Sequence, residues 1–398
     1  MTNLASSLGS RPCRAAGLLT RRATGMPVGA VFRVPRPVLS GRAKARTATA
    51  TARFLGSLRS LGMTGLGAWL ATTCAVIVLV APAARLAAQE SKVRTAELAP
   101  EAERAIDSGL RFLSRQQNTD GSWGKQYREA NTALALMAFM LKGHFPDKGP
   151  YGDAMDKAVG FLLERAKQGG GYMGVNMYEH GLGTLALSEA WGMSDRKEIR
   201  DTLKRAVDVI LRAQSPGGGW RYQPRPQDAD VSVTVMQIVA LASAKEAGIH
   251  VPSEVIEKAL KYVKGLQVGG EGGFGYQGPQ APEFARSAAG VMALLMCGER
   301  DSRAVLLGLE YLRRLPEGKF TEARFYFYGH YYAIQAMYQA GESYYQEWYP
   351  HIRDALITRQ HTDGSWSGGG EEGDSSYATS MSILILGVPY RFLPIYQR

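Results

Sequence analysis

"QQNTDGSWG" spans Gln116–Gly124 and "RQHTDGSWS" spans Arg359–Ser367, so Thr-Asp-Gly-Ser-Trp occurs twice in this chain of 398 residues. Each copy places a tight-turn Asp-Gly pair directly before a large aromatic side chain that ordinarily prefers burial. Weaker versions of the turn lie between the two copies, and each carries an aromatic anchor. The six anchors are Trp123, Tyr172, Trp220, Phe274, Phe320 and Trp366. Their spacing of 46 to 54 residues is typical of repeated supersecondary units.

Each unit contains two helical patterns, one on either side of its turn. Before the turn, segments such as 102–117 and 204–214 place apolar residues at i, i+3, i+4 and i+7, which predicts a helix with one wet face. After the turn, segments such as 131–141 and 233–244 are apolar almost all round, which predicts a helix buried on both sides. Each unit is therefore interpreted as an outer helix, a glycine-rich turn and an inner helix.

The order of the units predicts a closed ring rather than an open array. An open solenoid ends in atypical capping repeats, whereas here the first and last turns are the two most alike. Six helix pairs run from about Glu101 to Leu386. We therefore expect an all-α fold, an (α/α)6 toroid of six inner and six outer helices, forming a single domain over residues 90–398.

The repeated turn itself favours a structural role. A turn glutamine such as Gln117 or Gln360 is expected to bond the exposed carbonyls that end an outer helix, while the tryptophan packs under the next unit. Four of the six copies lack the aspartate, which argues against catalysis by the turn. The predicted structural turn residues are Gln117, Asp120, Gly121, Trp123, Trp220, Phe274, Asp363, Gly364 and Trp366.

The basic charge of the chain is concentrated near its start. The formal net charge is +11, but twelve of the 47 Lys and Arg residues precede Glu90, the first acidic residue, leaving 35 basic against 36 acidic residues. Since the remainder is almost neutral, a nucleic-acid partner is not expected. Residues 1–59 have no acidic residue and no sustained periodicity, and are interpreted as a disordered basic leader.

An uncharged segment at residues 60–84 follows that leader and precedes the small residues of "RLAAQES". A basic leader, an apolar run and a small-residue site are typical of an export signal, here cleaved near Ala88 or Gln89. The uncharged run is also long enough to remain as a membrane anchor. Residues 60–89 are therefore predicted to be a signal-peptide core or an anchor, with the toroid exported or held outside the cytoplasm.

The repeats resemble a known family. Gln-x-x-Asp-Gly-Ser-Trp after an outer helix resembles the QW-type repeat of squalene and hopene cyclases and of prenyltransferase β-subunits. "DADVSVTVMQIVALASAKEAGI" and "ILILGVPYRFLPIY" are similar to bacterial prenyltransferase/squalene-oxidase-repeat proteins. The resemblance covers roughly Glu101–Arg398 and implies the same toroid, but it leaves activity open because one fold hosts many functions.

Function is expected at the mouth of the ring, which we define as the N-terminal ends of the inner helices. Polar residues there interrupt helices that are otherwise almost purely apolar. The repeats align one such residue from each unit at roughly one level, namely Glu129, His180, Thr234, Ser287, His330 and Thr379. The alternative is a satisfied polar cap on a filled core. The predicted ligand-binding residues are Glu129, Asn131, Glu179, His180, Thr234, Arg286, Ser287, Tyr326, Tyr328, His330, Tyr377 and Thr379.

Asp228 and Asp230 are the candidate catalytic residues. Asp228-Ala229-Asp230-Val231-Ser232 resembles the Asp-x-Asp-Asp-Thr motif of class II terpene cyclases, whose middle aspartate protonates an alkene or epoxide. Val231 replaces the third acid, and that loss weakens the tuning of a protonated carboxyl group. The alternatives are that Asp230 caps the third inner helix, or that it binds a ligand.

Neither a metal nor a cofactor is expected. The zinc site of protein prenyltransferases needs Asp, Cys and His at the mouth, but Cys297 ends the fourth inner helix at the opposite end of the ring. His180 and His330 lie in opposite units without an evident third ligand.

The sequence leaves open whether the protein is an enzyme. The favoured interpretation is an exported toroid that binds an apolar small molecule, a peptide or a protein partner at its mouth, with membrane association through residues 60–84 if that segment is retained. The alternatives are a cyclase-like isomerase that uses Asp230 as its acid, and a glycan-active enzyme that uses a pair of mouth carboxylates.

Overall fold

The computed structural model describes residues 98–225, 227–390 and 393. The predicted leader and apolar segment, residues 1–89, lie outside the described residues. The chain divides into two units, Met1–Leu86 and Ala87–Arg398, and the second unit contains every element described below.

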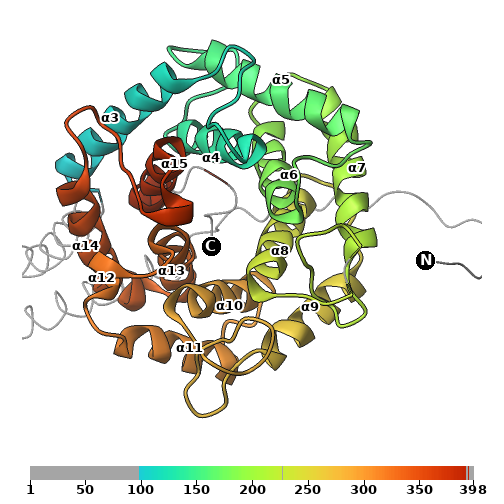
Figure 1. Cartoon of the computed structure of the whole chain (residues 1–398), viewed down its shortest axis with the longest axis vertical. Helices are drawn as coiled ribbons and strands as arrows, with labels where there is room; N and C mark the ends of the chain where they lie inside the picture. Colours follow the sequence, from blue (N-terminus) through green and yellow to red (C-terminus); the bar gives the residue numbers. More distant parts are fainter. Residues whose placement is uncertain (1–97, 226, 391–392, 394–398) are drawn as a thin grey trace, which may run out of the picture. The chain divides into compact units, whose positions relative to one another are not determined.

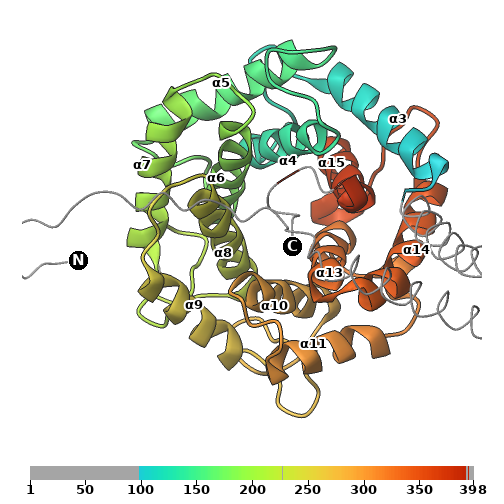
Figure 2. The same ribbon diagram turned by 180° about the vertical axis from the view of Figure 1, so that it is seen from behind.

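The second unit is a toroid of two concentric rings of helices, which confirms the predicted fold class (Figure 1). The view from behind shows the same two rings (Figure 2). The inner helices are α4 (Arg128–Leu141), α6 (Met177–Trp191), α8 (Val231–Glu246), α10 (Phe284–Met296), α13 (Tyr326–Ala340) and α15 (Ser375–Leu386). The outer helices are α3 (Pro100–Gln116), α5 (Gly152–Gln168), α7 (Glu198–Ala213), α9 (Ser253–Gly265), α11 (Arg303–Arg314) and α14 (Glu342–Arg359).

The ring closes through its first and last units. Helix α15 packs against both α4 and α3, and α14 lies beside α3. Beyond the twelve predicted helices, the fifth turn contains the short helix α12 (Lys319–Glu322), and two 3₁₀ segments follow at Gly370–Glu372 and Val388–Tyr390. In the described part of the chain there is no β-strand longer than an isolated bridge.

The turn glutamines join neighbouring outer helices. Gln117 Nε2 donates to the carbonyl of Gly121 in its own turn and to that of Ala154 in the next outer helix, at 2.9 and 2.8 Å. Gln214, Gln267 and Gln360 repeat this pattern. The prediction that the turn glutamine bonds the carbonyls that end an outer helix was therefore wrong. Its side chain instead donates to a carbonyl in the first turns of the next outer helix.

The turn glycine explains why the tryptophan can reach its buried position. Gly121 has φ +90°, a left-handed value that favours glycine, and a Cβ there would lie 2.5 Å from the carbonyl oxygen of Lys157 in α5. Gly364, with φ +92°, approaches Ser108 of α3 in the same way. Trp123 and Trp366 are buried between the two layers, and each donates its indole N–H to a carbonyl of its own outer helix at 2.8 Å.

The anchor of the second unit differs from the prediction. Met173 occupies the position of the tryptophans, because it follows the left-handed Gly171 by two residues, as Trp123 follows Gly121. Met173 is fully buried, whereas Tyr172 is half-buried. The turn requires a buried anchor rather than an aromatic one, and a search for aromatic side chains selected the neighbouring residue.

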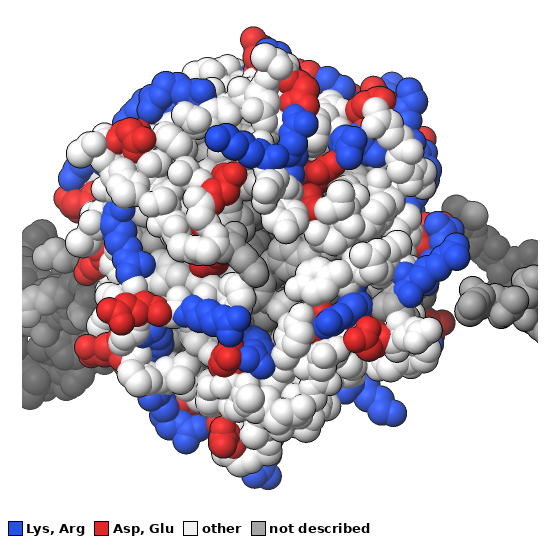
Figure 3. Space-filling model, in the orientation of Figure 1, with Lys and Arg blue, Asp and Glu red and all other residues white. Residues whose placement is uncertain are grey.

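Neither sign of charge dominates the face of the toroid seen in Figure 3. Lys and Arg are intermixed with Asp and Glu on the face seen in Figure 3, and the surface near its centre is hollowed. None of the described helices combines the length and the apolar character that a membrane crossing requires.

Candidate functional site

Tyrosines from three inner helices meet at the mouth of the ring. The hydroxyls of Tyr178 in α6 and Tyr332 in α13 lie 3.5 Å apart, although these helices are on opposite sides of the ring (Figure 1). Tyr328 packs edge-on against Tyr332, with ring centroids 4.9 Å apart, and it also faces Tyr178. Tyr377 of α15 completes this group, which we call the central tyrosine cluster. Side chains therefore close the centre of the ring at its mouth.

Asp230 lies at the start of α8 and has both carboxylate oxygens engaged. Oδ1 accepts the N–H of Val233 at 2.9 Å, as a helix N-cap does, and Oδ2 lies 3.0 Å from the guanidinium of Arg221. Burial raises the pKa of Asp230, while these two donors oppose the rise. The side chain is fully buried. These contacts match the helix-cap interpretation and leave the carboxyl group without a free face toward a substrate.

Arg221 connects Asp230 with the exposed rim of the mouth. Its Nε lies 3.6 Å from Asp228, and its guanidinium lies over the rings of Tyr222 and Tyr276, 5.6 and 5.5 Å from their centroids. Arg286 also lies over the ring of Tyr276, 5.9 Å from its centroid, and pairs with Glu283 at 2.6 Å. The third and fourth units thus supply an aromatic rim whose cations stack on tyrosines.

The fifth and sixth units supply a buried carboxylate. Glu372 accepts the N–H groups of Phe327 and Tyr328 at 3.3 and 2.9 Å, and its Oε1 lies 3.4 Å from the hydroxyl of Tyr377. Burial raises the pKa of Glu372, and the backbone donors oppose the rise. Glu372 therefore holds the first turn of α13 in place beside the central tyrosine cluster.

The residues predicted to share one level bind the turns instead of facing one another. Thr234, Ser287 and Thr379 are fully buried and accept the N–H of Trp220, Phe274 and Trp366 at 2.9 to 3.0 Å. In the first unit Thr132 has this role for Trp123, so the aligned residue is Thr132 and not Glu129. Each hydroxyl satisfies a backbone donor between the two layers, within its own unit.

The two histidines also lie between the layers. His180 accepts the N–H of Met173 through Nδ1 at 3.1 Å, and its Nε2 lies 3.0 Å from the carbonyl of Ala206. This pattern assigns the neutral tautomer, and burial lowers the pKa of His180 to about 4. His330 Nε2 bonds the carbonyl of Lys319 at 2.7 Å, and burial lowers its pKa to about 3. Both imidazoles are therefore neutral near pH 7.

Glu129 and Glu179 are brought into contact where the first and second units meet. Both are buried, and Glu129 lies close enough to Glu179 to oppose its ionisation. Burial first, and the neighbouring Glu129 carboxylate in addition, raise the pKa of Glu179 to about 7. Arg165 Nε pairs with Glu129 at 2.5 Å.

The other two candidates have local partners. Asn131 donates to the carbonyls of Gln126 and Tyr127 at 2.9 and 3.3 Å. Tyr326 donates its hydroxyl to the carbonyl of Phe320 at 3.0 Å. Of the predicted ligand-binding and catalytic residues, Asp228, Asp230, Arg286, Tyr328 and Tyr377 belong to the central tyrosine cluster or the aromatic rim, and the others bond groups within or between repeat units.

Several mouth residues were not selected from the sequence. Arg221, Tyr222 and Tyr276 directly follow turn anchors, where helical periodicity has ended, and Tyr178 lies within the second inner helix. Their common signal is an aromatic or basic residue within two positions of an anchor, or in the first turn of an inner helix. Within the described ranges, no cluster of three or more His, Cys, Asp or Glu side chains could hold a metal ion.

Comparison with known proteins shows the fold class. No family model and no curated protein matches the sequence. The type II terpene cyclase MstE from Scytonema superposes with a TM-score of 0.55 at 15% identity, covering 74% of this chain and 99% of that one. The GH76A α-1,6-mannanase of Salegentibacter sp. HEL1_6 gives 0.55 at 9% identity, covering 72% and 98%. A D-mannose isomerase gives 0.56 at 13% identity, covering 74% and 97%.

The protein is thus an (α/α)6 toroid with a terpenoid cyclase-like fold. The same fold is found in a cyclase, a glycoside hydrolase and an isomerase, so it accommodates each alternative raised by the sequence.

Proposed function

We propose that the mouth of the toroid binds an extended, partly apolar partner, such as a peptide segment, without chemical conversion. The observation that carries this proposal is the contact between Tyr178 and Tyr332 across the ring. A cyclase that folds a polyprene needs a deep apolar well, whereas here tyrosine side chains close the well at its entrance. Such a floor suits a ligand that lies across the mouth and stacks on aromatic rings.

The rim of the mouth supports the same proposal. Four large apolar side chains are prominently exposed in the described part of the chain, and Tyr127, Val175 and Tyr222 among them lie in turns that lead into inner helices. Exposed apolar residues gathered at one end of a protein are typical of an interaction surface. The fourth, Leu306, lies on the outer helix α11 and provides a matched control.

A peptide library displayed on phage, panned against the purified full-length chain, tests this proposal. We expect selected peptides whose binding weakens about tenfold or more when Tyr222 is changed to Ala, since an aromatic anchor at an interface commonly contributes more than 1 kcal/mol. Leu306→Ala should leave binding unchanged. Failure to select any peptide, or equal losses in the two variants, would refute binding at the mouth.

The acid-catalysed alternative requires a separate experiment. If Asp230 protonates a polyprene, the wild-type chain should turn over a geranylgeranyl substrate, and Asp230→Asn should abolish that turnover while leaving the helical content intact. Because Asp230 caps α8 and pairs with Arg221, we expect no turnover by either chain. Wild-type turnover that Asp230→Asn abolishes would replace the binding proposal with a cyclase.

We also propose that the toroid acts outside the cytoplasm, following export or anchoring through residues 60–84. The support is the sequence pattern alone. N-terminal sequencing of the mature chain, together with cell fractionation, tests it: a start near Ala88 or Gln89 in the exported fraction supports cleavage, and an intact chain in membranes supports an anchor. An intact chain in the cytoplasmic fraction would refute export.

A further inference from the structure

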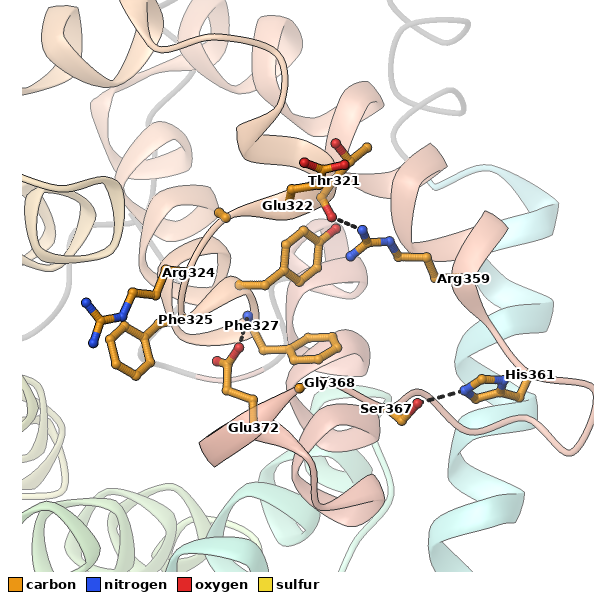
Figure 4. A pocket seen from close by; sticks show the side chains of 14 residues that line it. Thr321, Glu322, Arg324, Phe325, Phe327, Arg359, His361, Ser367, Gly368 and Glu372 are labelled. Atoms are coloured by element: carbon orange, nitrogen blue, oxygen red, sulfur yellow. Dashed lines mark hydrogen bonds between the residues drawn. The ribbon is translucent and has the colours of Figure 1, made fainter.

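A cavity of about 660 Å³ lies between the fifth and sixth turns (Figure 4). Its walls come from residues 321–327 and 359–372, and we call it the 5–6 pocket. It occurs where the repeat is irregular. The fifth turn has Leu315 in place of the turn glutamine, and the sixth turn continues through the glycines 368–370 before α15 begins.

Arg359 carries a positive charge into this pocket that no described carboxylate neutralises. Its guanidinium donates to the carbonyl of Thr321 and lies over the ring of Tyr326, 4.4 Å from the centroid. Both neighbours are neutral, and no ion pair to Arg359 is formed within the described residues. Figure 4 shows this guanidinium turned toward Thr321, on the side of the pocket where Ser367 and His361 lie. Arg359 is exposed, and within the described residues its guanidinium contacts a carbonyl group and an aromatic ring but no carboxylate.

The acidic residues of the pocket do not supply the missing charge. Glu372 is buried, and its oxygens are occupied by the N–H groups of Phe327 and Tyr328 and by the hydroxyl of Tyr377. Glu322 is exposed and forms no ion pair with Arg359 or Arg324 within the described residues. Arg324 lies on the other side of the pocket, over the ring of Phe325 at 4.8 Å (Figure 4).

The remaining walls are aromatic or uncharged. Phe327 lies between Arg359 and Glu372 in Figure 4, and His361 Nε2 lies 2.9 Å from Ser367 Oγ at one edge. At Gly369 and Gly370 even a Cβ would meet no neighbour, so the glycine segment leaves open space beside the pocket. The pocket therefore combines one preorganised guanidinium with an apolar wall.

We propose that the 5–6 pocket binds a carboxylate carried on an aromatic or apolar group, with Arg359 pairing the carboxylate and Phe327 contacting the apolar group. A guanidinium matches the planar geometry of a carboxylate and binds it more strongly than a neutral acceptor. A phosphate would bring a second negative charge close to Glu372 and Glu322. This inference does not depend on the mouth proposal, since the two sites use different side chains.

Titration of the full-length chain with three small probes tests the inference. 3-Phenylpropionate should bind saturably, 3-phenylpropionamide should bind at least tenfold more weakly because it lacks the charge, and phenyl phosphate should not bind better than the carboxylate. Equal binding of the amide and the carboxylate, tighter binding of the phosphate, or no saturable binding of 3-phenylpropionate by the wild-type chain would overturn the proposal.

A matched pair of arginine variants locates the binding. Arg314 ends α11 as Arg359 ends α14, and it donates to the carbonyl of Glu271 in the preceding turn at 3.0 Å, yet it does not line the pocket. Arg359→Gln should weaken binding of 3-phenylpropionate at least tenfold, while Arg314→Gln and the mouth variant Tyr222→Ala should leave that binding unchanged.

If Arg359→Gln does not fold, Arg359→Lys is the second variant. It keeps the charge but not the planar geometry, and it should also weaken binding of the probe. Unchanged affinity in the folded Arg359 variant, or equal loss in the Arg314 variant, would refute the assignment.

Discussion

The ionisation of Glu179 is expected to affect the stability of the folded state. Its pKa is raised to about 7 from an ordinary value of 4.5, by burial and then by Glu129. Between these pH values Glu179 holds a proton in the folded chain that it has lost in the unfolded chain. The contribution of Glu179 to folding stability is therefore fully present below pH 4.5 and is lost as the pH rises through 7. At 1.36 kcal/mol per pKa unit, the loss is on the order of 3 kcal/mol.

The change Glu179→Gln tests this dependence. Urea unfolding at pH 5 and pH 8 should show that Glu179→Gln gains more stability, or loses less, between these two pH values than the wild-type chain does. The substitution removes the Glu179 contribution and leaves the opposite contribution of the buried His180 and His330 unchanged. Glu164→Gln, at an exposed acid bonded by Gln168, serves as the control and should keep the wild-type slope. The same pH dependence in wild type and Glu179→Gln would contradict the raised pKa of Glu179.

Single positions also show where sequence reasoning succeeded. The cap at Asp230 was foreseeable, because an Asp before an apolar helix commonly accepts backbone N–H groups of the first turn. The contact between Glu129 and Glu179 was not foreseeable, because it joins two units. The pattern of apolar residues in each helix does not determine how the two helices are shifted along each other. The sequence alignment selected Glu129 in place of Thr132 because the segment between Trp123 and its hydroxyl partner is shorter than the segments after Trp220 and Trp366.

The turn and its anchor determine stability at the scale of the element. Trp123 and Trp366 fill the space between outer and inner helices, and each holds a carbonyl of its outer helix. Changing either to Ala should therefore lower the free energy of unfolding by about 3–5 kcal/mol. Thermal unfolding measures the loss, and binding of 3-phenylpropionate measured below the transition should persist. A loss below about 1 kcal/mol would contradict the anchor role.

Helix periodicity and turn spacing were enough to predict the two layers and their order, because each helix must bury a face of defined width. They were not enough to predict the contents of the mouth. Tyr222, Tyr276 and Glu372 lie in segments between helices, where no repeating pattern relates position to direction. The 5–6 pocket could not be predicted from the sequence either. It lies beside the turn in which Leu315 replaces the glutamine, and no motif marks its position.

Units two and five, on opposite sides of the ring, share several departures from the repeat. Each lacks the turn glutamine, each replaces the tryptophan anchor (by Met173 or Phe320), and each places a buried histidine where other units place Thr or Ser. These units also supply Tyr178 and Tyr332, which meet across the mouth. The whole molecule thus combines a six-unit frame with two opposed irregular units whose tyrosines meet at the centre of the mouth.

Closure of the ring gives the prediction at the scale of the whole molecule. Gln360 joins the last unit to Ala105 in α3, and Gln214 makes the equivalent bond to Val255 within the array. In a closed ring the two joints are equivalent, so Gln360→Ala and Gln214→Ala should each cost about 1–3 kcal/mol by leaving buried carbonyl groups without their donor. In an open solenoid the terminal joint would contribute far less. Urea unfolding of both variants decides between these cases, and a Gln360→Ala loss below one third of the Gln214→Ala loss would show that the ring is open in solution.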